Sequence, residues 1–226
     1  MFENIYTSGD YLAKHPTWHT EDSPGKAEQI MRMMAQNKIM PESICEVGCG
    51  AGEILKQLQQ HMDSQCMLWG YEISPQAYEL CKSRENAKLH FKLADIRQEK
   101  DTVFDLILLI DIIEHLEDYS SLLREIKPKS RYKILHIPLD LSMLNVVNDS
   151  VILKTRETYG HIHYFTRKIA LQMLKDLGYE VIDNFYTGPY ADFSTTQKLV
   201  RKLSFAIHRD LAVRVLGGWS LLVLAK

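Results

Sequence analysis

Short apolar runs alternate with segments of helical spacing along most of the chain. The run at residues 104–113, FDLILLIDII, is almost wholly apolar, which is typical of a strand buried on both faces of a parallel sheet. Residues 88–95 instead alternate strictly between apolar and polar positions, as a half-buried strand does. Strands are predicted at residues 43–48, 66–73, 88–95, 104–113, 132–139, 179–186 and 219–226, and helices are predicted to begin at Ser23, Glu53, Ser74, Asp118, Thr166 and Thr195.

The order of these elements predicts one domain of the α/β class. Strands that alternate with helices form a mostly parallel sheet with helices on both of its faces. The 226 residues are enough for one well-packed core and marginal for two. We therefore expect residues 1–226 to form a single domain, with an N-terminal arm and helix at 1–40 that can act as a lid, and with insertions at 140–165 and 190–217 that shape a binding site.

A cluster of glycines lies between the first predicted strand and the following helix, at Gly48, Gly50 and Gly52 in the sequence EVGCGAG. Glycine costs backbone entropy wherever it is ordered, so the cluster indicates a turn that a ligand approaches closely. A phosphate-binding loop is excluded because Glu53-Ile54 stands where such a loop has lysine followed by serine or threonine. A dinucleotide-binding turn is disfavoured, though not excluded, because Glu53 replaces its third glycine and would repel a pyrophosphate.

Acidic residues recur at the ends of successive predicted strands. They are Glu46 before the glycines, Glu72 in GYEIS, Asp95 in LADI and Asp111 in LLIDIIEHLED. Together with GHIHYFT ahead of a late helix, this series resembles class I S-adenosylmethionine-dependent methyltransferases of the small-molecule type. The resemblance covers most of the chain. It implies a three-layer Rossmann-like methyltransferase fold, with a mostly parallel seven-stranded sheet, and S-adenosyl-L-methionine as cofactor.

The resemblance also implies roles for individual residues. Glu72 would accept hydrogen bonds from both ribose hydroxyls, which a carboxylate can do with its two oxygens. Asp95 would bind the adenine amino group, and Glu46 and Asp111 would hold the methionine end. An acid-rich pocket suits this cofactor, because it carries a sulfonium and an ammonium group but no phosphate. The implied cofactor-binding residues are Glu46, Gly48, Cys49, Gly50, Gly52, Glu72, Ile73, Asp95, Ile96 and Asp111.

Three histidines are the candidates for catalysis, since a hydroxyl acceptor needs a base. His115 follows the fourth strand, and it could equally be a helix-start residue that makes local hydrogen bonds. His161 and His163 alternate along an extended stretch and could face the same way, although one of them could instead pin the loop. The sequence does not say which.

The methyl acceptor is expected to be a small molecule. Enzymes that methylate the amines of nucleic-acid bases usually have a proline pair and an aromatic residue after the fourth strand, where this chain has Asp111-Ile112-Ile113-Glu114. We expect O-methylation of a sugar, a quinone-type phenol or another metabolite. Two alternatives remain open: a nicotinamide-dependent oxidoreductase on a similar scaffold, and a non-catalytic cofactor-binding module.

Composition limits the classes of partner and the cellular compartment that we expect for this chain. With 27 basic and 29 acidic residues the formal net charge is −2, so nucleic acid is not an expected partner. A cytoplasmic location is expected, because the chain shows neither an apolar span long enough for a bilayer nor a signal peptide. Cys45 and Cys49 lack a second pair at zinc-site spacing, so no metal-binding residues are predicted, and the four cysteines are expected to be reduced and mostly buried. Whether a divalent ion is shared by the candidate histidines is left open, because nothing in the sequence fixes its geometry.

One segment raises the question of a membrane contact. Leu199, Leu203, Ala206, Ile207 and Leu211 form an apolar stripe at helical spacing, flanked by basic residues. Such a helix can lie on a membrane, but more often it packs its apolar face on the core. We expect core packing and do not favour peripheral membrane contact; the oligomeric state is left open.

Overall fold

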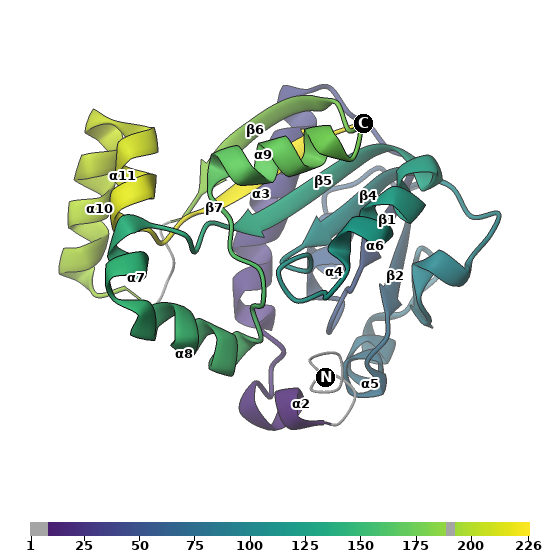
Figure 1. Cartoon of the computed structure of the whole chain (residues 1–226). Helices are drawn as coiled ribbons and strands as arrows, with labels where there is room; N and C mark the ends of the chain where they lie inside the picture. The colour runs from purple at the N-terminus through teal and green to yellow at the C-terminus, as the bar shows by residue number, and fades with distance from the viewer. Residues whose placement is uncertain (1–8, 189–192) are drawn as a thin grey trace.

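A seven-stranded sheet forms the centre of the computed structural model, which describes residues 9–188 and 193–226 (Figure 1). The strand order is β3-β2-β1-β4-β5-β7-β6, and only β7 runs antiparallel to its neighbours. All seven predicted strands are present, so the predicted fold class is confirmed. The strands are β1 (Ser43–Val47), β2 (Met67–Glu72), β3 (Leu89–Leu93), β4 (Phe104–Ile110), β5 (Ser130–Pro138), β6 (Val181–Thr187) and β7 (Ser220–Ala225).

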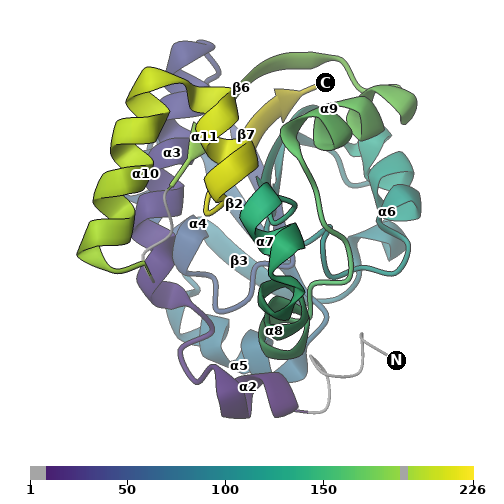
Figure 2. The ribbon, with the colours of Figure 1, turned by 60° about the vertical axis from the view of Figure 1, so that its left-hand side comes forward.

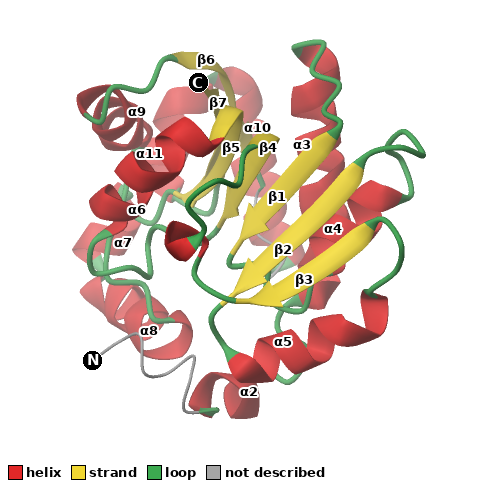
Figure 3. Ribbon diagram, turned by 90° about the vertical axis from the view of Figure 1, so that its right-hand side faces the viewer, coloured by secondary structure: helices red, strands yellow, loops and turns green. Residues whose placement is uncertain are grey.

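Helices cover both faces of the sheet, as Figure 3 shows. One core packs α3 (Ser23–Gln36), α4 (Glu53–Gln59) and α5 (Pro75–Cys81) on one face. The other core packs α6 (Tyr119–Ile126), α9 (Arg167–Asp176) and α11 (Arg209–Leu216) on the opposite face. The central strand β4 sends alternate residues to the two cores, because successive side chains of a strand point to opposite faces.

Strand β4 is shorter than its apolar pattern predicts. The strand ends at Ile110, whereas the apolar run continues to Ile113. Asp111 adopts a left-handed backbone conformation, with φ of 51°, and so turns the chain out of the sheet. Ile112 and Ile113 therefore belong to the turn that follows β4, at the carboxyl edge of the sheet.

Three α-helices within residues 9–188 and 193–226 were not predicted: α2 (Asp10–Lys14), α7 (Met143–Val147) and α8 (Asp149–Tyr159). Their apolar residues do not mark a helix by spacing, because α7 has only five residues and Val151, Ile152 and Leu153 of α8 are adjacent in the sequence. The helix predicted to begin at Thr195 ends at Ile207, because His208 separates α10 (Thr195–Ile207) from α11. The His208 side chain accepts a hydrogen bond from the Leu211 amide and thereby caps α11.

The apolar stripe of α10 faces solvent, so the expectation of core packing is wrong for this helix. Its apolar side chains are about half exposed or more: Leu199 56%, Leu203 58% and Ile207 86%. The helix is held instead through Phe205, whose ring stacks on Trp219 with the centroids 5.6 Å apart, and through its contact with α11. In the described part of the chain, no helix combines the length and apolarity needed to cross a bilayer.

The four cysteines are unpaired and buried, as predicted. Parts of two predicted segments, residues 1–8 of the arm and 190–192 of the second insertion, lie outside the described residues.

Candidate active site

The glycine turn joins β1 to α4 at the carboxyl edge of the sheet. Gly48, Gly50 and Gly52 all have left-handed backbone conformations, with φ of 67°, 55° and 76°. The amides of Gly48 and Cys49 donate to the Tyr71 carbonyl at 2.8 and 3.1 Å. Side chains also crowd the turn, because a Cβ on Gly48 would lie 2.5 Å from the Ile112 side chain. Both the backbone and the packing therefore require glycine here.

Glu46 is buried next to this turn with an unsatisfied oxygen. Its side chain lies at the end of β1 and the residue is 2% exposed. Oε2 has no hydrogen-bond partner among the described residues. Burial raises the pKa of Glu46 well above its ordinary value, the nearby Lys26 ammonium opposes the rise, and the carboxylates of Glu72 and Asp111 add to it. A cation or a hydrogen-bond donor next to Oε2 would therefore satisfy the buried carboxyl group of Glu46.

Glu72 ties the end of β2 to the glycine turn. Its Oε2 accepts from the Gly50 amide at 2.8 Å, and its Oε1 accepts from the amides of Ile73 and Ser74 at 2.9 and 2.8 Å. Burial raises the pKa of Glu72, and these three amides limit the rise. The same carboxylate that the sequence assigns to a ligand therefore also fixes the backbone that would surround that ligand.

Asp111 has two basic partners that the sequence analysis missed. Its Oδ2 lies 2.9 Å from Lys26 Nζ of α3, and its Oδ1 accepts from His136 Nδ1 of β5 at 2.5 Å. His136 Nε2 in turn lies 2.8 Å from the Thr187 hydroxyl. Burial alone would raise the pKa of Asp111, but His136 and Lys26 outweigh burial and hold the pKa well below its usual range. Asp111 is therefore ionised.

Asp95 and its neighbours lie at the ends of the outer strands. The Asp95 carboxylate pairs with the Arg97 guanidinium and caps the short helical turn that follows, by accepting from the Arg97 amide at 2.9 Å. Ile96 is buried, whereas Ile73 is 44% exposed. The Ala94 amide donates to the Glu72 carbonyl at 2.9 Å, which places Asp95 beside the end of β2. The exposed Ile73 side chain and the Asp95 carboxylate thus lie at the same carboxyl edge of the sheet.

The N-terminal arm lies over the glycine turn. A Cβ on Gly50 would lie 2.6 Å from Trp18 Cδ1, so the indole is in contact with the turn. His15 connects the arm to the end of α8, because its Nε2 lies 3.1 Å from the Thr158 carbonyl and its ring stacks on Tyr159 at 5.7 Å. Figure 2 shows α2 directly below α8. The arm therefore covers the turn and reaches the first insertion.

Two of the three candidate histidines are brought together. The rings of His115 and His161 lie 4.8 Å apart between centroids, and His161 Nδ1 lies 2.7 Å from Asp140 Oδ2. Burial, with the adjacent His161, lowers the pKa of His115 to about 3, against the effect of a hydrogen bond to the Gly160 backbone. His115 is therefore neutral near pH 7.

His163 lies elsewhere. Its Nε2 donates to the Leu116 carbonyl at 2.9 Å, and its ring meets Tyr119 edge-on. The extended stretch is fixed by the Glu114 carbonyl, which accepts from the amides of Ile162 and His163. His161 and His163 thus do not face the same way, and the contacts of His163 are those of a residue that pins the loop.

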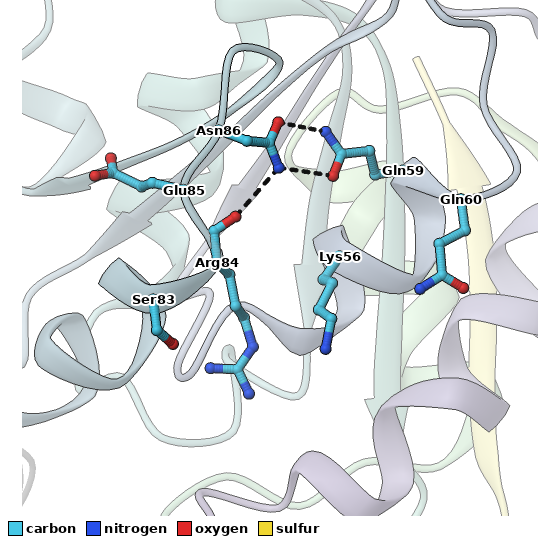
Figure 4. A pocket seen from close by; sticks show the side chains of 7 residues that line it. All are labelled: Lys56, Gln59, Gln60, Ser83, Arg84, Glu85 and Asn86. Carbon is cyan, nitrogen blue, oxygen red and sulfur yellow. Dashed lines mark hydrogen bonds between the residues drawn. The ribbon is translucent and has the colours of Figure 1, made fainter.

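One surface hollow is separate from this edge of the sheet. It lies beside the C-terminal half of α4 and is lined by polar side chains, among which the amides of Gln59 and Asn86 bond to each other (Figure 4). None of the predicted site residues lines it. A second hollow, between α3, β6 and α11, likewise contains none of them.

Comparison with known proteins gives a family match. A family model described as a methyltransferase domain matches residues 19–184. Over 92 residues, which are 38% of this chain, the sequence is 33% identical to ajmaline N-methyltransferase and 29% identical to norajmaline N-methyltransferase, both of Rauvolfia serpentina. The match spans about a third of the length of these relatives, 31% in both cases.

Solved structures share the fold at low sequence identity. Magnesium protoporphyrin IX methyltransferase from Synechocystis PCC 6803, crystallised with bound SAH, aligns with a TM-score of 0.62 and 15% identity over 89% of this chain and 82% of that chain. The N-methyltransferase NodS from Bradyrhizobium japonicum WM9, in complex with S-adenosyl-L-homocysteine, aligns with a TM-score of 0.58 and 13% identity over 89% and 85%.

Proposed function

The chain belongs to the methyltransferase domain family, and from this premise we propose that it transfers a methyl group from S-adenosylmethionine to a small-molecule acceptor. When bound, this cofactor supplies an electrophilic methyl group on a sulfonium. The protein contributes mainly by holding the donor and the acceptor in line.

The residues at the carboxyl edge of the sheet fit this cofactor. The observation that carries the proposal is the buried Oε2 of Glu46, which has no hydrogen-bond partner among the residues that the structure describes and lies beside a turn of three left-handed glycines. A buried carboxylate without a partner is costly, so the site is suited to a ligand that brings a cation or a donor. Glu72 and Asp111 increase the negative potential there, as their effect on the pKa of Glu46 indicates. A pyrophosphate would be repelled by the same set.

The roles of the outer residues follow from their position. Glu72 keeps one acceptor site on Oε2 for a ribose hydroxyl while it binds the Gly50 amide. The exposed Ile73 side chain offers an apolar surface to an adenine ring, and Asp95 offers an acceptor to the amino group while it remains paired with Arg97. Gly48, Cys49, Gly52 and Ile96 position the backbone around the ligand.

We further propose that the acceptor atom is an oxygen. A hydroxyl must lose its proton during methyl transfer, and the paired imidazoles of His115 and His161 are suited to orient the hydroxyl and receive that proton. Of the two, His161 is the better proton acceptor because Asp140 supports its ring. His115, with a pKa of about 3, would only orient the acceptor.

An amine acceptor is the second candidate. It is favoured by the names of the curated relatives, which are N-methyltransferases. An amine with a free lone pair needs no strong base, so it makes less use of the Asp140–His161 pair.

The surrounding segments support a small acceptor within one domain. The arm meets the first insertion where His15 contacts Thr158 and Tyr159. We propose that these segments bound the acceptor site and that the arm opens as a lid, because it covers the glycine turn in this structure.

Transfer of a labelled methyl group tests the function. Purified protein is incubated with methyl-labelled S-adenosylmethionine and a small-molecule metabolite extract, and labelled products are identified by mass spectrometry. We expect label in a small molecule, attached to oxygen. Label on nitrogen supports the amine acceptor instead, and no transfer from this donor to any fraction contradicts the proposed function.

A further inference from the structure

Glu114, His115 and His161 form a compact group of side chains next to the proposed acceptor site. Glu114 and His115 follow β4, and His161 comes from the loop between α8 and α9. One nitrogen or oxygen atom from each residue lies within 4.8 Å of the others. We propose that these three residues bind a divalent transition-metal ion. Among the residues that the structure describes, they are the only group of three or more potential ligands with such spacing.

The first argument is the state of Glu114. The residue is 0% exposed, and neither carboxylate oxygen has a hydrogen-bond partner within residues 9–188 and 193–226. A buried carboxylate with two unsatisfied oxygens is rare in folded proteins, because nothing replaces the water it has lost. The Lys26 ammonium, a cation that acts on Glu114 electrostatically, is hydrogen-bonded to Asp111 instead. A bound cation supplies the missing partner.

The second argument is how the two imidazoles are held. His161 Nδ1 lies 2.7 Å from Asp140 Oδ2, which leaves Nε2 as the nitrogen available to an ion. His115 hydrogen-bonds to the Gly160 backbone, and its Nε2 lies 3.9 Å from Glu114 Oε1. Histidines that bind metals usually donate their other nitrogen to a carboxylate or a carbonyl, which fixes the ring and its tautomer. The ring of His161 has this arrangement.

The distances are close to those of a metal centre. Ligand atoms about 2.1 Å from one ion lie roughly 3–3.5 Å apart in tetrahedral or octahedral geometry. The 3.9 Å between His115 Nε2 and Glu114 Oε1 therefore needs a contraction of less than about 1 Å, which small side-chain rotations provide. The three ligand atoms lie within 4.8 Å of one another, so the widest pair must close by up to about 1.8 Å.

The ligand chemistry selects the class of ion. Two imidazoles and one carboxylate suit zinc, manganese or iron, whereas magnesium prefers oxygen ligands. Three protein ligands also leave at least one coordination position open, as in catalytic metal sites. We infer that this position takes the oxygen of the acceptor. With the ion bound, His161 Nε2 is a ligand and no longer the proton acceptor; the ion would instead lower the pKa of the bound hydroxyl, whose proton would pass to water. This role rests on the proposed function, whereas metal binding does not.

Calorimetry with zinc tests the site. The full chain is stripped with a chelator, dialysed and titrated with zinc chloride. We expect one ion per chain, and an affinity at least about tenfold lower in His161→Gln and Glu114→Gln. The matched control is His163→Gln, which alters a neighbouring histidine on the same loop and should retain the affinity. Absence of zinc binding, or equal affinity in all four proteins, overturns the proposal.

A second measurement covers variants that fail to fold. Crystals of the unaltered chain are soaked in zinc, and the anomalous signal is mapped. A peak between Glu114, His115 and His161 supports the proposal, and ordered zinc elsewhere with no peak there overturns it. Binding of S-adenosylhomocysteine is measured in parallel, so that failure of the metal site and failure of the proposed function give different results.

Discussion

Lys26 Nζ lies 2.9 Å from Asp111 Oδ2, and this ion pair joins the first long helix to the carboxyl end of the central strand. Asp111 turns the chain out of β4 with its left-handed backbone, and it also receives the His136 imidazole at 2.5 Å. The Lys26 ammonium also opposes the rise in the pKa of Glu46, whose Oε2 has no hydrogen-bond partner in the described part of the chain. One lysine therefore partly neutralises the acids to which we assign a cationic cofactor.

Replacing Lys26 by methionine should favour S-adenosylmethionine over S-adenosylhomocysteine. The first carries one more positive charge, so removing a nearby cation strengthens its binding selectively. Two unit charges about 8 Å apart interact by roughly 0.5–2 kcal/mol at an effective dielectric constant of 80–20, which corresponds to an affinity ratio increased several-fold. Calorimetric titration with both ligands measures the ratio. Lys168→Met, an exposed lysine on α9, is the control, and an unchanged ratio in Lys26→Met would show that Lys26 does not act on the cofactor.

Gly50→Ala should weaken cofactor binding by at least about tenfold. Gly50 has φ of 55°, and a Cβ there would lie 2.6 Å from Trp18, so the turn or the arm must shift. Gly25→Ala is a matched control, because a Cβ at Gly25 meets nothing within 4 Å. The double variant Trp18→Ala/Gly50→Ala separates the two causes: restored affinity assigns the loss to the arm alone, and continued loss assigns it to the turn.

Binding of S-adenosylmethionine should release a proton from Glu46. Burial raises the pKa of Glu46 in the free protein, and a bound cation lowers it again, so affinity should increase as the pH rises through the pKa of the free protein. Calorimetry in buffers of different ionisation enthalpy measures the released proton. Glu46→Gln should abolish the release and flatten the pH dependence. An identical proton release in this variant would assign the proton to another group.

The raised pKa of Glu46 also predicts how the stability of the fold depends on pH. Since the pKa of Glu46 in the folded protein is raised above about 4.5, its contribution to stability is present below that pH and is lost as the pH rises through the folded value. Relative to Glu46→Gln, the unaltered protein should lose free energy of unfolding as the pH rises from about 4.5. Denaturant titrations across this range compare the two proteins, and parallel pH profiles would contradict the assignment.

Glu72→Gln should destabilise the fold as well as weaken binding. The carboxylate accepts from three backbone amides, and an amide side chain replaces one of its acceptor oxygens by a donor that faces them. The expected loss is about 1.5–3 kcal/mol in the free energy of unfolding, as for hydrogen bonds to a charged group. Glu79→Gln, on the exposed side of α5, should change stability little. Equal stability of Glu72→Gln and the unaltered protein would show that these hydrogen bonds contribute little.

The strands and the packed helices could be predicted because their apolar residues follow the patterns typical of a strand or of a helix. Helix α8 could not, since its apolar residues Val151, Ile152 and Leu153 are adjacent in the sequence and form no stripe at helical spacing. The apolar stripe of α10 led to a wrong prediction of core packing. The spacing of apolar residues shows that a helix has an apolar face, but it does not show which part of the protein covers that face. The end of β4 was missed because Ile112 and Ile113 are as apolar as the strand, although Asp111 has already turned the chain.

The acids of the site could be located from their positions after successive strands, but their partners could not. Lys26 looks like any lysine near a helix start, and only the fold places it beside Asp111. His136 gave a weak signal, as a histidine within an apolar strand. The pairing of Asp140 with His161 joins residues 21 positions apart through a loop of irregular pattern, and it is visible only in three dimensions.

Calorimetric titration of the full chain with S-adenosylmethionine tests the central claim most directly. The account predicts one binding site per chain whose affinity falls in Glu46→Gln and Gly50→Ala and is retained in Gly25→Ala. Absence of binding, or binding of NADH at the same turn in place of S-adenosylmethionine, would contradict it.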